Sequence, residues 1–419
     1  MPLFMVRVYG FLASEAAAGV VLILAAALAM TMANSPWQHF YQALLDVPAE
    51  VRIGSFSLTK PILLWINDGL MAVFFFLVGL EVKYETRAGS LSNLRRAALP
   101  AFAAAGGMAI PSLVYSALNW SDPAALEGWA IPASTDIAFA LGILALAGNS
   151  PPALRAFLLS VAIFDDLGAV VIIAMFYTGS LSQLALAAAA ILFAGVVILN
   201  RLGVTSAGMY LLFGVPMWVC LLKSGIHATL AGVLVAIMIP GSAPARAIQS
   251  PPSPLLSSPT LSPLKHIERY LNPWVKFGVL PVFAFANAGV PLGGSSISDL
   301  WHPVALGIAL GLLIGKPIGI LAASFAAVRL GYAVLPDGVG WPRLAGASLL
   351  CGVGFTMSLF IASLAFERDG AFTSLGLERI GVLSGSILAS LAGFIAIRRA
   401  PARAGAYSAL AAPPRPPSA

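Results

Sequence analysis

The segment LSVAIFDDLGAVVIIAMF, residues 159–176, places two adjacent carboxylates, Asp165 and Asp166, in the middle of an apolar run. A helix needs about 20 apolar residues to cross about 30 Å of hydrocarbon, and this run with its flanks has that length. An ionisable side chain at that depth costs roughly 2.5–3.5 kcal/mol and marks a functional site by default. No basic residue lies in the segment. It therefore predicts a membrane-spanning helix whose carboxylates exchange protons or bind a hard cation, with a structural ion pair as the alternative.

Apolar segments of similar length recur along the whole chain. Of its 419 residues, 59% are hydrophobic and 10% are charged, whereas roughly 25% are charged in soluble domains. The mean hydropathy is +0.92. The candidate spans are residues 15–33, 62–82, 98–118, 124–147, 153–177, 183–200, 207–221, 224–240, 270–290, 304–328, 343–366 and 378–397. We predict an all-α polytopic membrane protein with about twelve transmembrane helices, forming a single domain over residues 1–419.

The loops and termini predict the orientation. If the N-terminus is cytoplasmic, 17 of the 23 Lys and Arg residues fall on the inner side, and the positive-inside rule then places both termini in the cytoplasm. The Pro/Ser-rich residues 249–263 predict a cytoplasmic linker, and residues 400–419 predict a disordered cytoplasmic tail. Val51 to Thr59 alternates apolar and polar residues around Gly54, which predicts a short β-hairpin on the outer face.

Composition and motifs exclude several classes of function. Cys220 and Cys351 lie in separate apolar runs, so neither a disulfide nor a thiolate metal site is expected. Basic inner loops explain the net charge of +6 without a nucleic-acid partner. The sequence contains no glycine-rich phosphate loop, Walker motif or nucleophile elbow. An ion gradient is therefore the expected source of energy, and ATP is not.

Two candidate spans are interrupted. In AIPASTDIAFALG, residues 130–142, Pro132 precedes Asp136 and breaks the helix, because proline removes a backbone hydrogen bond and clashes with the preceding turn. In CGVGFTMS, residues 351–358, Gly352 and Gly354 weaken a span of the second half. Interrupted helices at corresponding positions of two halves are typical of a transporter site. Ordinary kinks in packed helices are the alternative.

Lys316, in LLIGKPIGIL at residues 312–321, is the spare positive charge at membrane depth. We expect it to pair with one of the carboxylates or with the negative ends of the interrupted helices. Snorkelling of its side chain to the membrane interface is the alternative.

Four further titratable residues are weaker candidates. His227, in LKSGIHATLAG, is a possible pH-sensitive group because of its normal titration range, although a packing role is the more ordinary one. Glu81, Glu85 and Glu268 belong to a mixed-charge rim with nearby lysines, and most such rims are solvated helix ends.

Seven collinear motifs resemble those of the bacterial NhaA-type sodium/proton antiporter family, over residues 11–397. They are LWINDGLMAVFFFLVGLEVK (64–83), EGWAIPASTDIAFALGILAL (127–146), IFDDLGA (163–169), LKSGIHATLAG (222–232), PVFAFANAGV (281–290), LLIGKPIGI (312–320) and LCGVGFTMSLFIASLAF (350–366). The resemblance implies twelve helices with inverted-topology repeats, for which NhaA is itself a standard example. It also implies that the fourth and eleventh spans cross, at Ser134 to Asp136 and at Gly352 to Thr356.

The resemblance also implies the roles of the site residues. Asp166 would be the principal sodium ligand, and Asp165 would be the proton carrier that pairs with Lys316. Thr135 would assist cation binding, and Asp136 would offset the facing helix ends. Sodium or lithium would compete with protons for the carboxylates, with no cofactor and no enzymatic reaction.

The transport that the resemblance implies is electrogenic, because more protons enter than sodium ions leave, and it serves pH and sodium homeostasis. The protein would lie in the inner membrane of a bacterium, as a homodimer paired through the hairpin near Val51 to Thr59. Two residues depart from well-known members: Tyr84 replaces an arginine and Arg269 replaces a histidine, so the pH profile need not carry over. A sodium-coupled symporter and a non-transporting membrane sensor or scaffold are the alternative functions.

Overall fold

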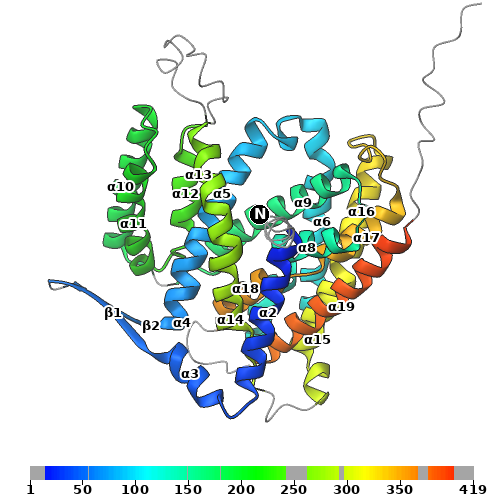
Figure 1. The fold of residues 1–419 in the computed structure, drawn as a ribbon, viewed down its shortest axis with the longest axis horizontal. Helices are drawn as coiled ribbons and strands as arrows, with labels where there is room; N and C mark the ends of the chain where they lie inside the picture. Colours follow the sequence, from blue (N-terminus) through cyan, green and yellow to red (C-terminus); the bar gives the residue numbers. More distant parts are fainter. Residues whose placement is uncertain are drawn as a thin grey trace, which may run out of the picture.

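The structure is a computed structural model that describes residues 15–54, 56–148, 150–179, 181–241, 262–291, 297–366 and 376–400. The first 14 residues, most of the predicted linker at 249–263 and nearly all of the predicted tail at 400–419 lie outside these described residues. Helices dominate the described part, and a two-stranded sheet projects from one side (Figure 1).

The structure describes eighteen α-helices, α2 to α19. In the first half they are α2 (Glu15–Ala33), α3 (Gln38–Asp46), α4 (Ile62–Trp65), α5 (Met71–Arg87), α6 (Leu94–Leu118), α7 (Pro123–Leu126), α8 (Ile137–Ala147), α9 (Pro152–Phe176) and α10 (Gln183–Arg201). In the second half they are α11 (Ala207–Ser224), α12 (Leu230–Met238), α13 (Pro263–Trp274), α14 (Leu280–Ala288), α15 (Pro303–Leu310), α16 (Lys316–Arg329), α17 (Trp341–Cys351), α18 (Phe355–Phe366) and α19 (Leu377–Arg399).

Short irregular turns join some of these helices into longer ones. Three are π-helical: η1 (Ile66–Leu70) between α4 and α5, η5 (Val275–Val279) between α13 and α14, and η7 (Gly311–Gly315) between α15 and α16. Three are 3₁₀-helical: η2 (Ser90–Ser92), η3 (Glu127–Ala133) and η6 (Ile297–Trp301). π-Turns inside α-helices often occur at functional sites, and η7 directly precedes Lys316.

The predicted class, a polytopic helical membrane protein, is confirmed. Within the described residues, eight continuous helical segments are long and apolar enough to span a membrane, and two bent pairs raise the number to ten. The bent pairs join Pro123–Ala133 to Ile137–Ala147 at 45° and Trp341–Cys351 to Phe355–Phe366 at 42°. These are the two interruptions that the sequence predicts.

The other two of the twelve predicted segments are also helical, but neither contains a helix that is both long enough and apolar enough to span a membrane. In residues 224–240 the helix α12 has nine residues, which rise about 14 Å and cover about half of the hydrocarbon. In residues 270–290, α14 continues from α13 through η5, and Asn272, Lys276 and Asn287 dilute the apolar character of the segment.

The predicted hairpin is present and extends beyond Val51 to Thr59. Strands β1 (Pro48–Ile53) and β2 (Phe56–Pro61) pair antiparallel, from Pro48 opposite Pro61 to Ile53 opposite Phe56. Gly54 has φ of +60°, a left-handed conformation that glycine adopts without strain. At its base, Lys60 Nζ lies 2.8 Å from Asp68 Oδ2, so the hairpin is anchored to η1.

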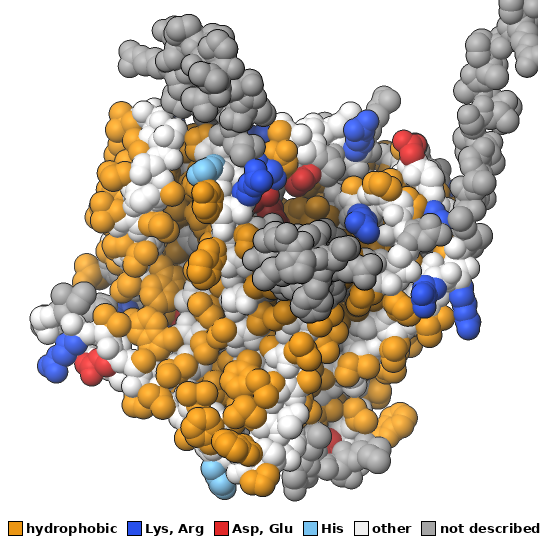
Figure 2. Space-filling model, in the orientation of Figure 1, with side chains coloured by type: hydrophobic (Ala, Val, Ile, Leu, Met, Phe, Trp, Pro, Cys, Tyr) orange, Lys and Arg blue, Asp and Glu red, His pale blue; other side chains and the backbone are white. Residues whose placement is uncertain are grey.

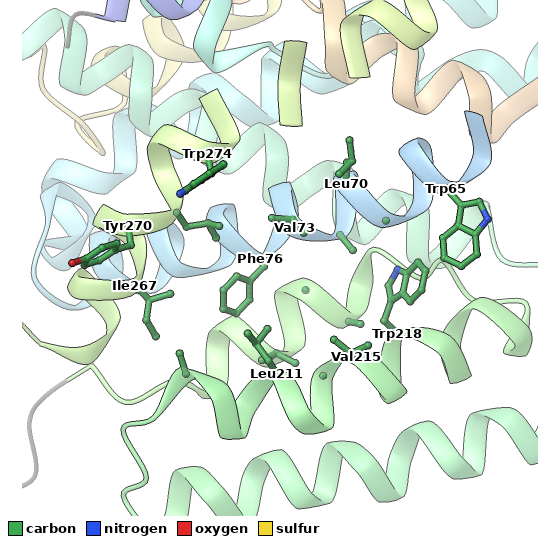
Figure 3. A pocket seen from close by; sticks show the side chains of 18 of the residues that line it. Trp65, Leu70, Val73, Phe76, Leu211, Val215, Trp218, Ile267, Tyr270 and Trp274 are labelled. Carbon is green, nitrogen blue, oxygen red and sulfur yellow. The ribbon is translucent and has the colours of Figure 1, made fainter. Parts of the chain in front are cut away.

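Much of the molecular surface is apolar (Figure 2). Leu184, Ile191 and Met175 are at least 70% exposed, which would be costly in water but is expected of side chains that face lipid. An apolar groove of about 910 Å³ runs between α5, α11, α12 and α13 (Figure 3). Trp65 and Trp218 lie at one end of it and Tyr270 and Trp274 at the other, as aromatic residues do at the two interfaces of a membrane.

Candidate functional site

The two interrupted helices meet at their breaks. Residues 134–136 separate η3 from α8, and residues 352–354 separate α17 from α18. Pro132 lies at the end of η3, where it prevents an α-helix from continuing. The backbone N–H of Asp136 donates to the carbonyl of Val353 at 2.7 Å, so each break satisfies part of the backbone of the other. This matters inside a membrane, where no water is available to do so.

Asp136 caps the N-termini of two helices with one carboxylate. Its Oδ1 accepts from the backbone N–H of Phe139 at 2.9 Å, in the first turn of α8. Its Oδ2 accepts from the backbone N–H of Thr356 at 3.1 Å and from the Thr356 hydroxyl at 2.6 Å, at the start of α18. Helix N-termini carry partial positive charge, so a buried carboxylate is stabilised where two of them face each other.

Lys316 provides the opposite charge. Its ammonium group is fully buried and donates to the carbonyl of Ala133, the last residue of η3, where the helix end carries partial negative charge. The same Nζ lies 2.8 Å from Asp165 Oδ2. Directly before Lys316, η7 packs closely against α6, since a Cβ on Gly315 would lie 2.9 Å from the Cα of Pro111.

Asp165 is held on one oxygen only. Besides the ammonium group of Lys316, Oδ2 has the hydroxyl of Thr135 at 2.6 Å, and that hydroxyl also lies 2.9 Å from the carbonyl of Cys351. The hydroxyl has one hydrogen, so it donates to one of these two oxygens at a time. Asp165 Oδ1 is buried and has no hydrogen-bond partner among the described residues.

Asp166 is held on neither oxygen. The residue is fully buried, and both Oδ1 and Oδ2 have no hydrogen-bond partner in the described part of the chain. The charged groups within electrostatic range are Asp165, Glu81, Asp136 and Lys316, of which only the lysine is positive. A carboxylate in this position is stabilised by taking up a proton or a cation. Among the described residues no cluster of three or more His, Cys, Asp or Glu side chains forms a metal site.

A cavity of about 240 Å³ leads from a charged rim toward the crossing. Three carboxylates line it, those of Glu81 and Glu85 on α5 and Glu268 on α13. At its other end it is lined by Ile137, which follows Asp136, and by Ile163, which lies one helical turn or less before the paired aspartates. The cavity therefore connects the rim with the surroundings of the buried carboxylates.

The structure brings most of the predicted residues into two groups. Thr135, Asp136, Asp165 and Lys316 contact one another or the same helix ends, and Asp166 adjoins them. The three predicted glutamates gather at the rim. His227 joins neither group, since it lies in the turn between α11 and α12, where its ring packs edge-on against Phe360 at 6.2 Å between centroids.

Two residues of the crossing have roles that the sequence reading missed. Thr356 holds Asp136 through both its backbone N–H and its hydroxyl. Ser386 on α19 accepts through its hydroxyl oxygen from the N–H of Phe355 at 3.1 Å. Thr356 could have been identified from the sequence, because its hydroxyl follows the Gly352 to Gly354 interruption by two residues. Nothing in the local sequence distinguishes Ser386.

The chain is similar to known proteins over nearly its whole length. The model of the family described as Na+/H+ antiporter 1 matches residues 9–397. The Na(+)/H(+) antiporter NhaA of Shewanella amazonensis is 52% identical over 94% of this chain and 97% of its own length. NhaA of Shewanella oneidensis is 53% identical over 92% and 95%, and NhaA 1 of Syntrophotalea carbinolica is 52% identical over 93% and 95%.

Proposed function

Because the chain belongs to the NhaA family of Na+/H+ antiporters, we propose that it exchanges Na+ or Li+ for protons at the paired aspartates Asp165 and Asp166. Exchange of Na+ for H+ follows from family membership, as does transport without a cofactor and without an enzymatic reaction. The assignment of residues to this exchange is our proposal. The observation that carries it is the pair of buried, unpartnered oxygens on Asp166.

In this proposal Asp166 is the principal cation ligand. Hard cations such as Na+ prefer oxygen ligands, and Asp166 offers two oxygens that have no hydrogen-bond partner among the described residues. The unpartnered Oδ1 of Asp165 supplies a third, and the hydroxyl oxygen of Thr135, next to Asp165, supplies a fourth. Protons compete for the same carboxylates, so the protein carries one kind of ion or the other.

Asp165 acts as the proton carrier. While it is ionised, the ammonium group of Lys316 compensates its charge at 2.8 Å. When Asp165 takes up a proton, Lys316 keeps its bond to the carbonyl of Ala133 and with it a partner. Two carboxylates accept two protons, whereas they share one monovalent cation, so more protons enter than cations leave and the exchange is electrogenic.

Asp136 maintains the crossing while the other charges change. Its three hydrogen bonds join the N-termini of α8 and α18, so it offsets helix ends and does not bind the cation. Competition then forces exchange, because an empty, charged site is costly to move through hydrocarbon whereas either occupied form costs less.

The rim residues Glu81, Glu85 and Glu268 form the entry from the cytoplasm and adjust the pH response, and His227 is a separate candidate for that response. The excess of Lys and Arg on one side supports a cytoplasmic position for both termini under the positive-inside rule. The bacterial relatives support a location in the inner membrane, where the exchange would serve pH and sodium homeostasis. The projecting hairpin pairs two copies as a homodimer (Figure 1), because among the described residues no further strand covers the outer edge of either β1 or β2.

The test measures proton release on adding Na+ or Li+ to everted vesicles, from about pH 6 to about pH 9. We expect exchange by the native protein and loss of exchange in both Asp165→Asn and Asp166→Asn. The control is Asp46→Asn, which removes an exposed carboxylate at the end of α3 and should leave exchange unchanged. If both site variants exchange normally, the paired aspartates are not the ion site, and if the native protein releases no protons the antiport assignment itself fails.

A further inference from the structure

The mouth of the 240 Å³ cavity contains a contact that the exchange mechanism does not use. Lys265 Nζ on α13 lies 2.7 Å from Glu268 Oε1 on the same helix. The same Nζ lies 3.9 Å from the centre of the Tyr84 ring on α5. Figure 2 shows acidic and basic side chains together in this region, at the edge of the apolar surface. A single ammonium group thus bridges the two helices that form the mouth.

Carboxylates outnumber ammonium groups among the described residues that line this cavity. Glu268 is 8% exposed, and its Oε2 has no hydrogen-bond partner among the described residues. Asn272, one turn further along α13, also lines the cavity with a buried and unpartnered Oδ1. Oxygens of this kind attract a cation, and the ammonium group of Lys265 is the one paired with Glu268.

The charged groups that face this mouth form one connected set. From α5 come Glu81 and Glu85, from α13 come Lys265 and Glu268, and from η5 comes Lys276. Glu81 lies within electrostatic range of the other four, and it is also within range of Asp166. The position of the Lys265 ammonium group therefore sets how negative the entry is, and Glu81 transmits that charge toward the buried pair.

We propose that Tyr84 is a positioning residue that holds Lys265 on Glu268, and that this tethered cation weakens the capture of Na+ at the cytoplasmic entry. The aromatic face attracts the ammonium group, and Lys265 is partly exposed, so without the ring its long side chain would spend more time in solvent. Glu268 would then be less compensated, and the entry would attract Na+ more strongly. The proposal rests on the Na+/H+ exchange proposed above.

The experiment compares the apparent KM for Na+ and the maximal rate of proton release in proteoliposomes. The variants are Tyr84→Leu, which removes the ring, and Tyr84→Phe, which keeps it. Each is also made in a Lys265→Gln background, and ionic strength is held constant with choline chloride because surface charges are screened by salt. Lys265→Gln by itself tests the same contact from the other helix, should a Tyr84 variant fold poorly.

We expect Tyr84→Leu to lower the apparent KM about two- to fivefold at unchanged maximal rate, the factor that corresponds to an exposed cation–π contact. Tyr84→Phe should match the native protein, and Lys265→Gln should lower the KM like Tyr84→Leu. In the Lys265→Gln background, Tyr84→Leu should have no further effect. The proposal is overturned if Leu and Phe behave alike, if the Leu effect persists without Lys265, or if the maximal rate falls with KM unchanged. Exchange by the native protein in the same assay separates these outcomes from failure of the proposed function.

Discussion

Replacing Lys316 by glutamine tests whether the buried ion pair holds the crossing together. Lys316 and Asp165 are both 0% exposed, and their charged atoms are 2.8 Å apart. Without the ammonium group, Oδ2 of Asp165 keeps only the hydroxyl of Thr135, which is shared with a backbone carbonyl. Removing one partner of a buried ion pair costs about 3–5 kcal/mol, because the remaining charge is left uncompensated. We expect Lys316→Gln to lower the free energy of unfolding by about that amount.

A second substitution separates loss of the charge from loss of the side chain. Asp165→Asn combined with Lys316→Gln removes both charges and leaves two amides that can hydrogen-bond at the same place. Neutral replacement of a whole buried pair is often tolerated. The loss of unfolding free energy in the double variant should therefore be about 0.5–3 kcal/mol smaller than the summed losses of the two single variants. Thermal unfolding in detergent, followed by the fluorescence of the eight tryptophans at one scan rate, compares the stability of the native protein, the two single variants and the double variant.

The ion pair does not stabilise the crossing if Lys316→Gln melts at the same temperature as the native protein. It also does not stabilise the crossing if the double variant loses as much stability as the two single variants together.

Three further predictions concern the helix ends and the packing around the site. Asp136→Asn should cost about 2–5 kcal/mol in a melting assay, since the amide cannot accept from two helix N-termini at once. Gly106→Ala should destabilise by about 1–3 kcal/mol, because its Cβ would lie 2.3 Å from the carbonyl oxygen of Gly319 on α16, whereas Gly278→Ala, which meets open space, should be neutral. Tyr41→Phe should cost about 1–3 kcal/mol through loss of a buried hydrogen bond to α14, and the loss should be the same from about pH 6 to about pH 9, because burial raises the pKa of Tyr41 to about 12.

Sequence reasoning located the interruptions because their causes are local. Pro132 and the glycines at 352 and 354 act on the turn in which they lie, and the structure has its two breaks within a few residues of them. The number of spans was less predictable. Apolar length identifies a segment but does not show how much of it is helical, and the turn at Gly225, whose φ is +84°, shortens the helix that follows.

The partners within the site could not be predicted from local patterns. Asp136 and Thr356 are 220 residues apart in the chain, and periodicity carries no information about which distant helix end faces a carboxylate. The titration range of histidine likewise does not show where in the fold the side chain lies. His227 packs against Phe360, away from the rim. The rim of Glu81, Glu85 and Glu268, in contrast, was predictable, because these residues lie near lysines at the ends of apolar segments.

In the proposed mechanism, the charges at the crossing require a proton or a cation at the site whenever it moves between the two sides of the membrane. Asp136 is compensated by two positive helix ends, and Asp165 is compensated by Lys316, whose ammonium group also serves the negative end of η3. One carboxylate, that of Asp166, then remains with no compensation from the described residues. In the proposed mechanism only a proton or a metal cation can supply it, and each must leave before the other binds. Competition between the two ions at Asp166 is therefore a consequence of one missing positive charge and requires no separate gate, while Asp165 carries the second proton that makes the proposed exchange electrogenic.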